Sequence, residues 1–257
     1  ILHSFPTRRS SDLTATLAAA LILLGAAAWA VTPTAMMVAR LDDGAAAAPL
    51  VRAVALVLGC LLGGASATAA LPTVPRPIVL GAAALAAGVV LALPVSQQAL
   101  TTEAGLVVAA VAATAAGAWL GARTPPGLGT VGAAAFMQLA IITAVVVGNA
   151  WLARHHGTDP RPWIPLGLGM FAGGAAAARL VPGVTTGHVA ASWLLVAVAS
   201  LGLAVVLAEQ RAFVLAAAIG TAFILPFPIA LSALGAALVR RRGPPPADLP
   251  AATTVRE

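Results

Sequence analysis

Apolar residues occupy this chain in long runs that short polar segments separate. About eight runs approach or exceed the roughly 20 residues that a helix needs to cross about 30 Å of hydrocarbon. Within the runs, apolar residues surround the whole helix, whereas a helix of a soluble bundle keeps them on one face. We therefore predict an all-α polytopic transmembrane helical bundle. Its spans are expected at about residues 14–39, 49–71, 77–94, 103–121, 130–153, 163–180, 188–208 and 212–239.

The segments between the runs carry most of the charges and prolines, as connections between membrane helices do. They lie at residues 40–44, 72–77, 123–127 and 154–161. Residues 243–257 are Pro-rich and polar, so we expect a disordered cytoplasmic tail after the transmembrane domain of residues 14–242.

The composition favours a membrane protein over the alternative, a soluble all-helical protein rich in Ala. Hydrophobic residues make up 60% of the 257 residues, charged residues only 9%, and the mean hydropathy is +0.99. A soluble domain carries about a quarter of its residues as charges. The net charge of +6 comes from arginines scattered between apolar runs, so we expect the lipid bilayer and no nucleic acid as a partner.

The distribution of arginines predicts the orientation in the membrane. With eight spans both termini lie on one side, and that side carries Arg76, Arg123, Arg179 and residues 240–242. The opposite side carries fewer arginines and more acidic residues. Since cytoplasmic connections are enriched in basic residues, we expect a multi-pass protein of the cell membrane with both termini in the cytoplasm.

A glycine-rich pattern occurs twice, which predicts an internal repeat. Gly59–Gly64 reads GCLLGG and precedes Pro72, and Gly169–Gly174 reads GMFAGG and precedes Pro182. Both the first glycine and the proline recur after 110 residues. We predict two four-helix units, residues 14–127 and 128–242, which point the same way because each has an even number of spans. The alternative is that Ala- and Gly-rich sequence aligns with itself by chance.

Pairs of glycines four residues apart predict close helix contacts. In lipid, small residues let helix backbones approach each other. We expect these pairs to pack helices inside the bundle in preference to forming a dimer. The pairs are Gly59 and Gly63, Gly117 and Gly121, and Gly169 and Gly173.

A central glutamine and three prolines are the candidates for a substrate path. Pro33 interrupts the first run, and Pro226 and Pro228 interrupt the last, so backbone carbonyls there need other partners. Gln138 is the most central polar residue and should face the bundle interior. Structural kinks and an interhelical hydrogen bond of Gln138 are the alternatives.

Signatures of enzyme chemistry are missing from the sequence. It has no HExxH, GxSxG or Walker motif. His155, His156 and Asp159 form a loose metal-binding pattern, and His188 with Ser192 is the one candidate pair for an intramembrane serine protease. We expect no enzymatic activity, no metal and no cofactor. The single cysteine, Cys60, excludes an intrachain disulfide.

The second glycine-rich segment resembles the major facilitator transporters. Residues 165–174, PLGLGMFAGG, followed by 178–182, ARLVP, are similar to a helix, loop and helix of fourteen-span drug exporters. The resemblance implies a secondary transporter that exports an unknown small molecule by alternating access. It also implies that Arg179, and Arg76 in the first copy, lie in cytoplasmic loops. The family's repeat has six helices, however, whereas the 110-residue offset fits four. The competing function is a non-transporting membrane subunit of a secretion or envelope complex.

We interpret the first residues of the sequence as foreign to the natural protein. Residues 3–13, HSFPTRRSSDL, resemble the in-frame translation of a sequencing adapter, and the chain starts with Ile. We therefore exclude residues 1–13 from the fold and expect a fragment that lacks part of its natural N-terminus. The alternative is the basic start of a signal peptide.

Overall fold

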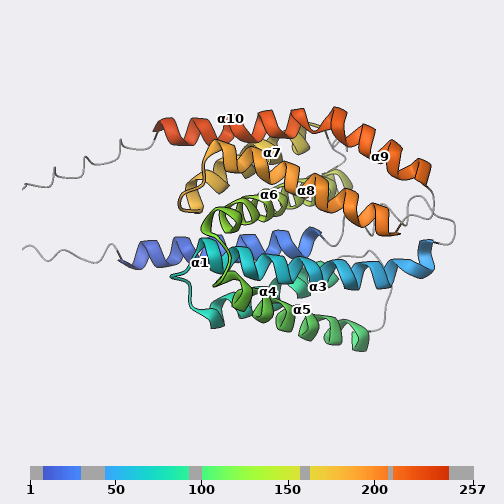
Figure 1. The fold of residues 1–257 in the computed structure, drawn as a ribbon, viewed down its shortest axis with the longest axis horizontal. Coiled ribbons are helices and arrows are strands. Elements are labelled where there is room, and N and C mark those ends of the chain that lie inside the picture. Colours follow the sequence, from blue (N-terminus) through green and yellow to red (C-terminus); the bar gives the residue numbers. More distant parts are fainter. Residues whose placement is uncertain (1–7, 30–43, 93–99, 157–162, 208–210, 243–257) are drawn as a thin grey trace, which may run out of the picture.

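The computed structural model describes residues 8–29, 44–92, 100–156, 163–207 and 211–242, and this part of the chain consists of helices joined by short turns (Figure 1). The helices, labelled as in Figure 1, are α1 (Arg8–Trp29), α3 (Gly44–Ala70), α4 (Arg76–Ala92), α5 (Leu100–Gly121), α6 (Pro126–His156), α7 (Trp163–Leu180), α8 (Thr186–Leu207), α9 (Arg211–Ile224) and α10 (Pro226–Arg242). The all-α prediction is confirmed.

Most helix limits lie within a few residues of the predicted runs. Two differ for physical reasons. Helix α1 begins at Arg8 and so includes residues that we had excluded, because the helix of the apolar run extends in the N-terminal direction into them. The last run forms two helices, α9 and α10, since Pro226 cannot donate a backbone hydrogen bond and instead occupies the first turn of α10.

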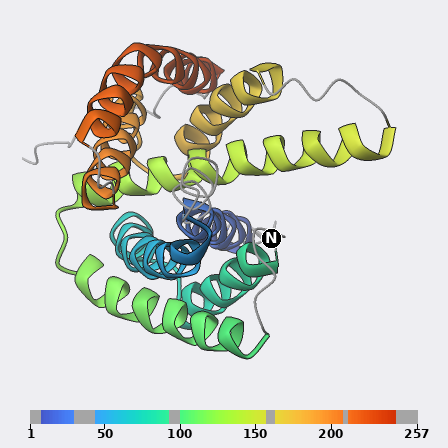
Figure 2. The same cartoon turned by 90° about the vertical axis from the view of Figure 1, so that its right-hand side faces the viewer.

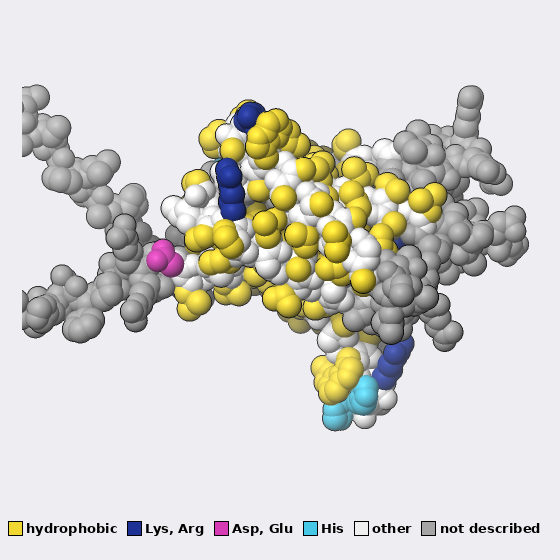
Figure 3. Space-filling model, turned by 90° about the horizontal axis from the view of Figure 1, so that it is seen from below, with side chains coloured by type: hydrophobic (Ala, Val, Ile, Leu, Met, Phe, Trp, Pro, Cys, Tyr) yellow, Lys and Arg dark blue, Asp and Glu magenta, His cyan; other side chains and the backbone are white. Residues whose placement is uncertain are grey.

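The helices form a membrane-embedded protein. Among the residues that the structure describes, five segments are long and apolar enough to cross a membrane, namely Asp12–Trp29, Arg52–Ala70, Ala104–Gly121, Pro126–His156 and Ala218–Arg241. Outward side chains of these segments and of α4 are apolar: Leu85, Val108 and Phe223 are 74%, 69% and 82% exposed. Figure 3 shows hydrophobic atoms spread over the visible face of the molecule. Such a surface is stable in contact with lipid tails and costly in water.

Helices α1 and α6 lie at the centre of the bundle. Seen end-on in Figure 2, α3, α4 and α5 lie on one side of this pair and α7 to α10 on the other. The chain enters α1 and leaves α10 at the same end of the molecule (Figure 1). The turns between α3 and α4, α5 and α6, and α7 and α8 also lie at this end.

Glycines bring the helices into backbone contact. A side chain at Gly25 of α1 would overlap the carbonyl of Phe136 in α6. One at Gly117 of α5 would overlap the carbonyl of Leu61 in α3, and one at Gly235 of α10 would overlap that of Phe171 in α7. The backbones of these helix pairs therefore lie so close together that no side chain fits between them at the glycines.

The six glycines named from the sequence all lie at contacts within the bundle. Gly59 and Gly63 face Ala26 of α1, Gly117 and Gly121 face α3, and Gly169 and Gly173 face Ile142 and Gln138 of α6. A methyl group at these positions needs a shift of the neighbouring helix.

We predict opposite effects for two Gly→Ala variants. Gly117→Ala should destabilise the protein by about 1–3 kcal/mol, because its Cβ overlaps the Leu61 carbonyl. Gly81→Ala in α4 is the matched control, since no atom lies within 4 Å of a Cβ at that position. It should be neutral or stabilise by up to about 1 kcal/mol through helix propensity. Reversible unfolding in mixed detergent micelles measures both, and equal effects would contradict this packing.

Candidate functional site in the second half of the bundle

Polar side chains from α6, α8 and α10 meet inside the bundle. Gln138 of α6, Ser192 of α8 and Ser232 of α10 are each at most 1% exposed. Helix α7 runs beside them, and Gly173 of α7 lies directly against the backbone of Gln138. Buried polar groups in a membrane protein need partners, so the arrangement of their hydrogen bonds determines what the site can do.

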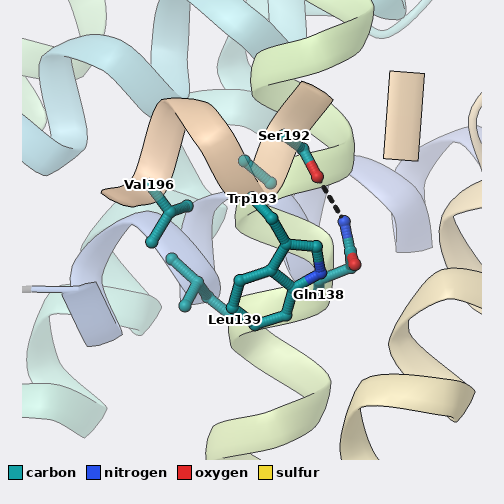
Figure 4. A pocket seen from close by; sticks show the side chains of 6 residues that line it. Gln138, Leu139, Ser192, Trp193 and Val196 are labelled. Atoms are coloured by element: carbon teal, nitrogen blue, oxygen red, sulfur yellow. Dashed lines mark hydrogen bonds between the residues drawn. The ribbon is translucent and has the colours of Figure 1, made fainter. Parts of the chain in front are cut away.

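Gln138 and Ser192 are joined by a hydrogen bond (Figure 4). The Gln138 Nε2 donates to Ser192 Oγ at 2.6 Å and to the carbonyl of Ala134 at 3.1 Å. Ser192 Oγ in turn donates to the carbonyl of Val189 at 2.6 Å. Both amide hydrogens of Gln138 and the hydroxyl hydrogen of Ser192 are therefore used.

The remaining oxygen of Gln138, Oε1, is buried without a hydrogen-bond partner. The orientation of the amide follows from its neighbours. With nitrogen and oxygen exchanged, Oε1 would lie 3.1 Å from the carbonyl oxygen of Ala134, where neither atom carries a hydrogen. A buried acceptor without a donor costs about 1–3 kcal/mol. Gln138 thus presents a free acceptor inside the bundle.

A second hydrogen-bonded chain crosses three helices beside Gln138. Trp193 of α8 donates its Nε1 hydrogen to Ser232 Oγ at 2.9 Å, and Ser232 donates to the carbonyl of Met170 in α7 at 3.0 Å. Ser232 approaches α7 this closely because Gly174 faces its backbone. This chain fixes the position of the Trp193 ring, which lies next to Gln138 in Figure 4.

The recess beside Gln138 has apolar walls. Ala135, Leu139 and Val196 line it together with Gln138, Ser192 and Trp193. In this conformation it has no room for a water molecule. None of the six lining side chains is charged, so the recess is neutral as well as closed. It can accept a small group that donates a hydrogen bond only after the surrounding helices separate.

The three prolines named as substrate-path candidates do not line this recess as the structure describes it. Pro226 begins α10, and Pro228, which is buried, precedes Ser232 by one helical turn. The chain between α9 and α10 is bridged by the hydrogen bond from Ile229 N to Leu225 O at 3.3 Å. Pro33 lies outside the described residues.

In the two histidine patterns, His155 and His188 hydrogen-bond to residues outside those patterns. The Nδ1 of His188 accepts the backbone hydrogen of Thr185 at 3.0 Å, at the start of α8, whereas Ser192 is bonded to Gln138 and Val189. His155 stacks on Trp151 with ring centroids 4.4 Å apart. No group of three or more His, Cys, Asp or Glu residues is close enough to hold a metal ion among the residues searched, which do not include Asp159.

The sequence did not indicate the roles of three residues that are buried or join helices in the structure. Trp193 and Ser232 gave no signal, because their importance arises from contacts between helices that are distant along the chain. Arg52, one of the arginines predicted on the side opposite the termini, is 2% exposed inside α3. Its signal was an arginine three residues after the start of the apolar run predicted at 49–71.

Comparisons of the chain with protein-family models, curated proteins and solved structures gave no match.

We predict that removing the amide of Gln138 does not cost stability. Gln138→Leu has a similar volume and eliminates the unpartnered Oε1, so its free energy of unfolding should be unchanged or about 1 kcal/mol higher. Ser192→Ala should instead cost about 0.6–1 kcal/mol, since it removes a hydrogen bond between membrane helices. Both are measured by unfolding in mixed micelles. A strongly destabilised Gln138→Leu variant would identify Gln138 as a structural residue.

Proposed function

We propose that this protein is part of a secondary active transporter that exports a small molecule, and that Gln138 contacts the substrate. The observation that carries this proposal is the buried Oε1 of Gln138, which has no donor. A substrate hydroxyl or amine would supply that donor. The apolar walls of the recess would hold the remainder of such a molecule.

Matching turns support an internal repeat of four helices. Backbone hydrogen bonds run from Leu71 to Ala67, Val74 to Leu71 and Val79 to Pro75 in the first half. The same bonds occur 110 residues later, from Val181 to Ala177, Val184 to Val181 and Val189 to Thr185. The correspondence covers the end of one helix, the turn and the start of the next, although the two sequences share few residues there.

Matching glycine contacts extend the correspondence to the last helix of each unit. Gly64 faces Thr114 as Gly174 faces Ser232, and Gly117 faces Leu61 as Gly235 faces Phe171. The offset is 110 residues in α3 and α7 and 118 residues in α5 and α10. In this alignment the pair of α9 and α10 corresponds to α5, which brings the number of spans to eight.

The correspondence makes the polar site specific to the second half. Gly59 faces Ala26 as Gly169 faces Ile142, an offset of 116 residues that places Ile22 opposite Gln138. At the offset of 110, Ala82 and Ala83 take the places of Ser192 and Trp193. The first half thus has apolar residues at these three positions, and only Thr114, in the place of Ser232, is polar there. Packing alone therefore does not require an amide at position 138, which favours a role in binding.

The central helix pair and the broken last helix supply a route for opening. The two halves meet mainly along α1 and α6, where Gly25 lies against Phe136. Because the recess lies between α6 and α8, both in the second half, rocking about this contact would open the space beside Gln138 only by separating α8 from α6. The break at Leu225 lets α9 tilt while α10 keeps its contact with α7. The resemblance to major facilitator transporters agrees with this mechanism, whereas the four-helix unit departs from that family.

One observation favours the alternative of a non-transporting subunit of a membrane complex. Helix α6 has 31 residues, about 46 Å of helix, and its last turns extend beyond the other helices (Figure 2). Trp151 and Leu152 are about half exposed there, and Arg154, His155 and His156 are exposed as well. An unpacked end of this kind would suit a neighbouring subunit.

The proposed topology predicts which positions face the cytoplasm. Single cysteines in a Cys60→Ala background can be labelled on intact cells with a membrane-impermeant maleimide. His156→Cys, at the end of α6, should react from outside, and Thr124→Cys, in the turn before α6, only after permeabilisation. The reverse pattern would place both termini outside.

Alternating access predicts that the recess opens to water. Val196→Cys in the Cys60→Ala background should react with the same reagent from both sides of proteoliposomes, because transport must expose the recess in turn. Val198→Cys is the matched control on the same helix. Val198 is 68% exposed on the lipid-facing surface, where a thiol does not ionise and should stay unreacted. An inert Val196→Cys would exclude transport through this recess and leave the complex subunit as the better explanation.

A further inference from the structure

A second hollow lies between α4 and α5, at the end of the molecule from which both termini leave. It has a volume of about 250 Å³ and is lined by Arg76, Leu80, Ala115, Ala118 and Trp119. It lies in the first half of the bundle, away from Gln138. Figure 3 shows arginine atoms at this end of the molecule beside a largely apolar surface.

The mouth of this groove is positively charged. Arg76 is exposed and opens the first turn of α4, where the helix dipole is also positive. The Arg123 guanidinium lies 3.6 Å from the centre of the Trp119 ring, and its Nη1 donates to the Trp119 carbonyl at 3.3 Å. Neither arginine forms an ion pair with a carboxylate in the described part of the chain.

The depth of the groove is apolar. Leu80 lies one helical turn further into α4 than Arg76, and Ala115 lies one turn further into α5 than Trp119. The alanines of α5 leave the space that larger side chains would fill. The polarity therefore changes from charged to apolar along the direction in which the helices cross the membrane.

We propose that this groove binds an anionic phospholipid. The phosphate would lie between Arg76 and Arg123 at the cytoplasmic surface, with one acyl chain along Leu80 and Ala115. Trp119, which is 57% exposed, has the amphipathic ring that is typical of the level of the headgroups. Basic pockets between membrane helices attract anionic headgroups by charge, and the apolar floor selects a lipid over a free anion. The inference depends on membrane insertion and is independent of transport.

The second half of the bundle offers a matched control. At the offsets described above, Thr186 and Ala237 take the places of Arg76 and Trp119, while Arg241 takes the place of Arg123. Arg241 is exposed at the same end of the molecule but has neither the first arginine nor the aromatic wall beside it. Arg241→Gln thus removes an equal charge without changing the groove.

The test measures the thermal unfolding and the native mass spectrum of the purified full-length chain in a mild non-ionic detergent. Phosphatidylglycerol, phosphatidylcholine and inorganic phosphate are added separately. We expect phosphatidylglycerol to raise the unfolding temperature and to remain bound, and the other two to do neither. Affinity should fall by about fivefold for each of Arg76→Gln and Arg123→Gln, and Arg241→Gln should bind as the unmodified protein does.

Three results would overturn the proposal. Equal stabilisation by phosphatidylcholine would mean that acyl chains bind without charge recognition. Equal stabilisation by inorganic phosphate would identify a free anion as the ligand. Full binding by the double arginine variant would place the lipid elsewhere. Should that variant fail to fold, Leu80→Trp keeps both arginines and fills the floor of the groove, so undiminished lipid binding by Leu80→Trp would equally refute the site.

Discussion

Backbone contact between helices at glycines is the constraint on which the rest of this structure depends. In lipid, burying an apolar side chain between helices gains little over leaving it among acyl chains, so helices associate through close packing of their surfaces. Gly25 between α1 and α6, Gly117 between α5 and α3, and Gly235 between α10 and α7 make this packing possible. Many large side chains, such as Leu85 and Phe223, lie on the outside of the bundle, where they suit contact with lipid.

The same contacts position the polar groups. Gly174 brings α7 against α10, which places Ser232 Oγ within reach of both the Met170 carbonyl and the Trp193 ring nitrogen. Gly173 likewise brings α7 against Gln138. The result is that Trp193 is fixed and Gln138 has little space, so its Oε1 gains a partner only if the helices move. In this conformation, close packing therefore holds the site rigid and also leaves the Gln138 Oε1 without a hydrogen-bond donor.

The sequence predicted the features that depend on local pattern. Apolar runs located the helices, the glycine pairs located contacts between them, and the central position of Gln138 in its apolar run indicated that it faces the bundle interior. The Trp193 and Ser232 hydrogen bond was beyond reach, because it joins residues 39 positions apart through a helix geometry that no local pattern encodes. The burial of Arg52 was missed for the related reason that a charge near the end of an apolar run normally extends to the membrane surface. The break at Pro226 was predictable, since proline acts on its own helix.

The differences between the two halves would suit a first half that stays fixed in the membrane and a second half that moves. If the halves are copies of one unit, their shared contacts describe the scaffold, and their differences indicate where function was added. The first half has Ile22 where the second has Gln138, and it alone has an arginine and a tryptophan, Arg76 and Trp119, beside a groove between α4 and α5. The second half has the polar recess and the broken last helix. A bound anionic lipid would hold the start of α4 and the end of α5 at the membrane surface. Rocking about α1 and α6 would then displace the second half relative to a fixed first half, and the free acceptor of Gln138 would lie on the part that moves.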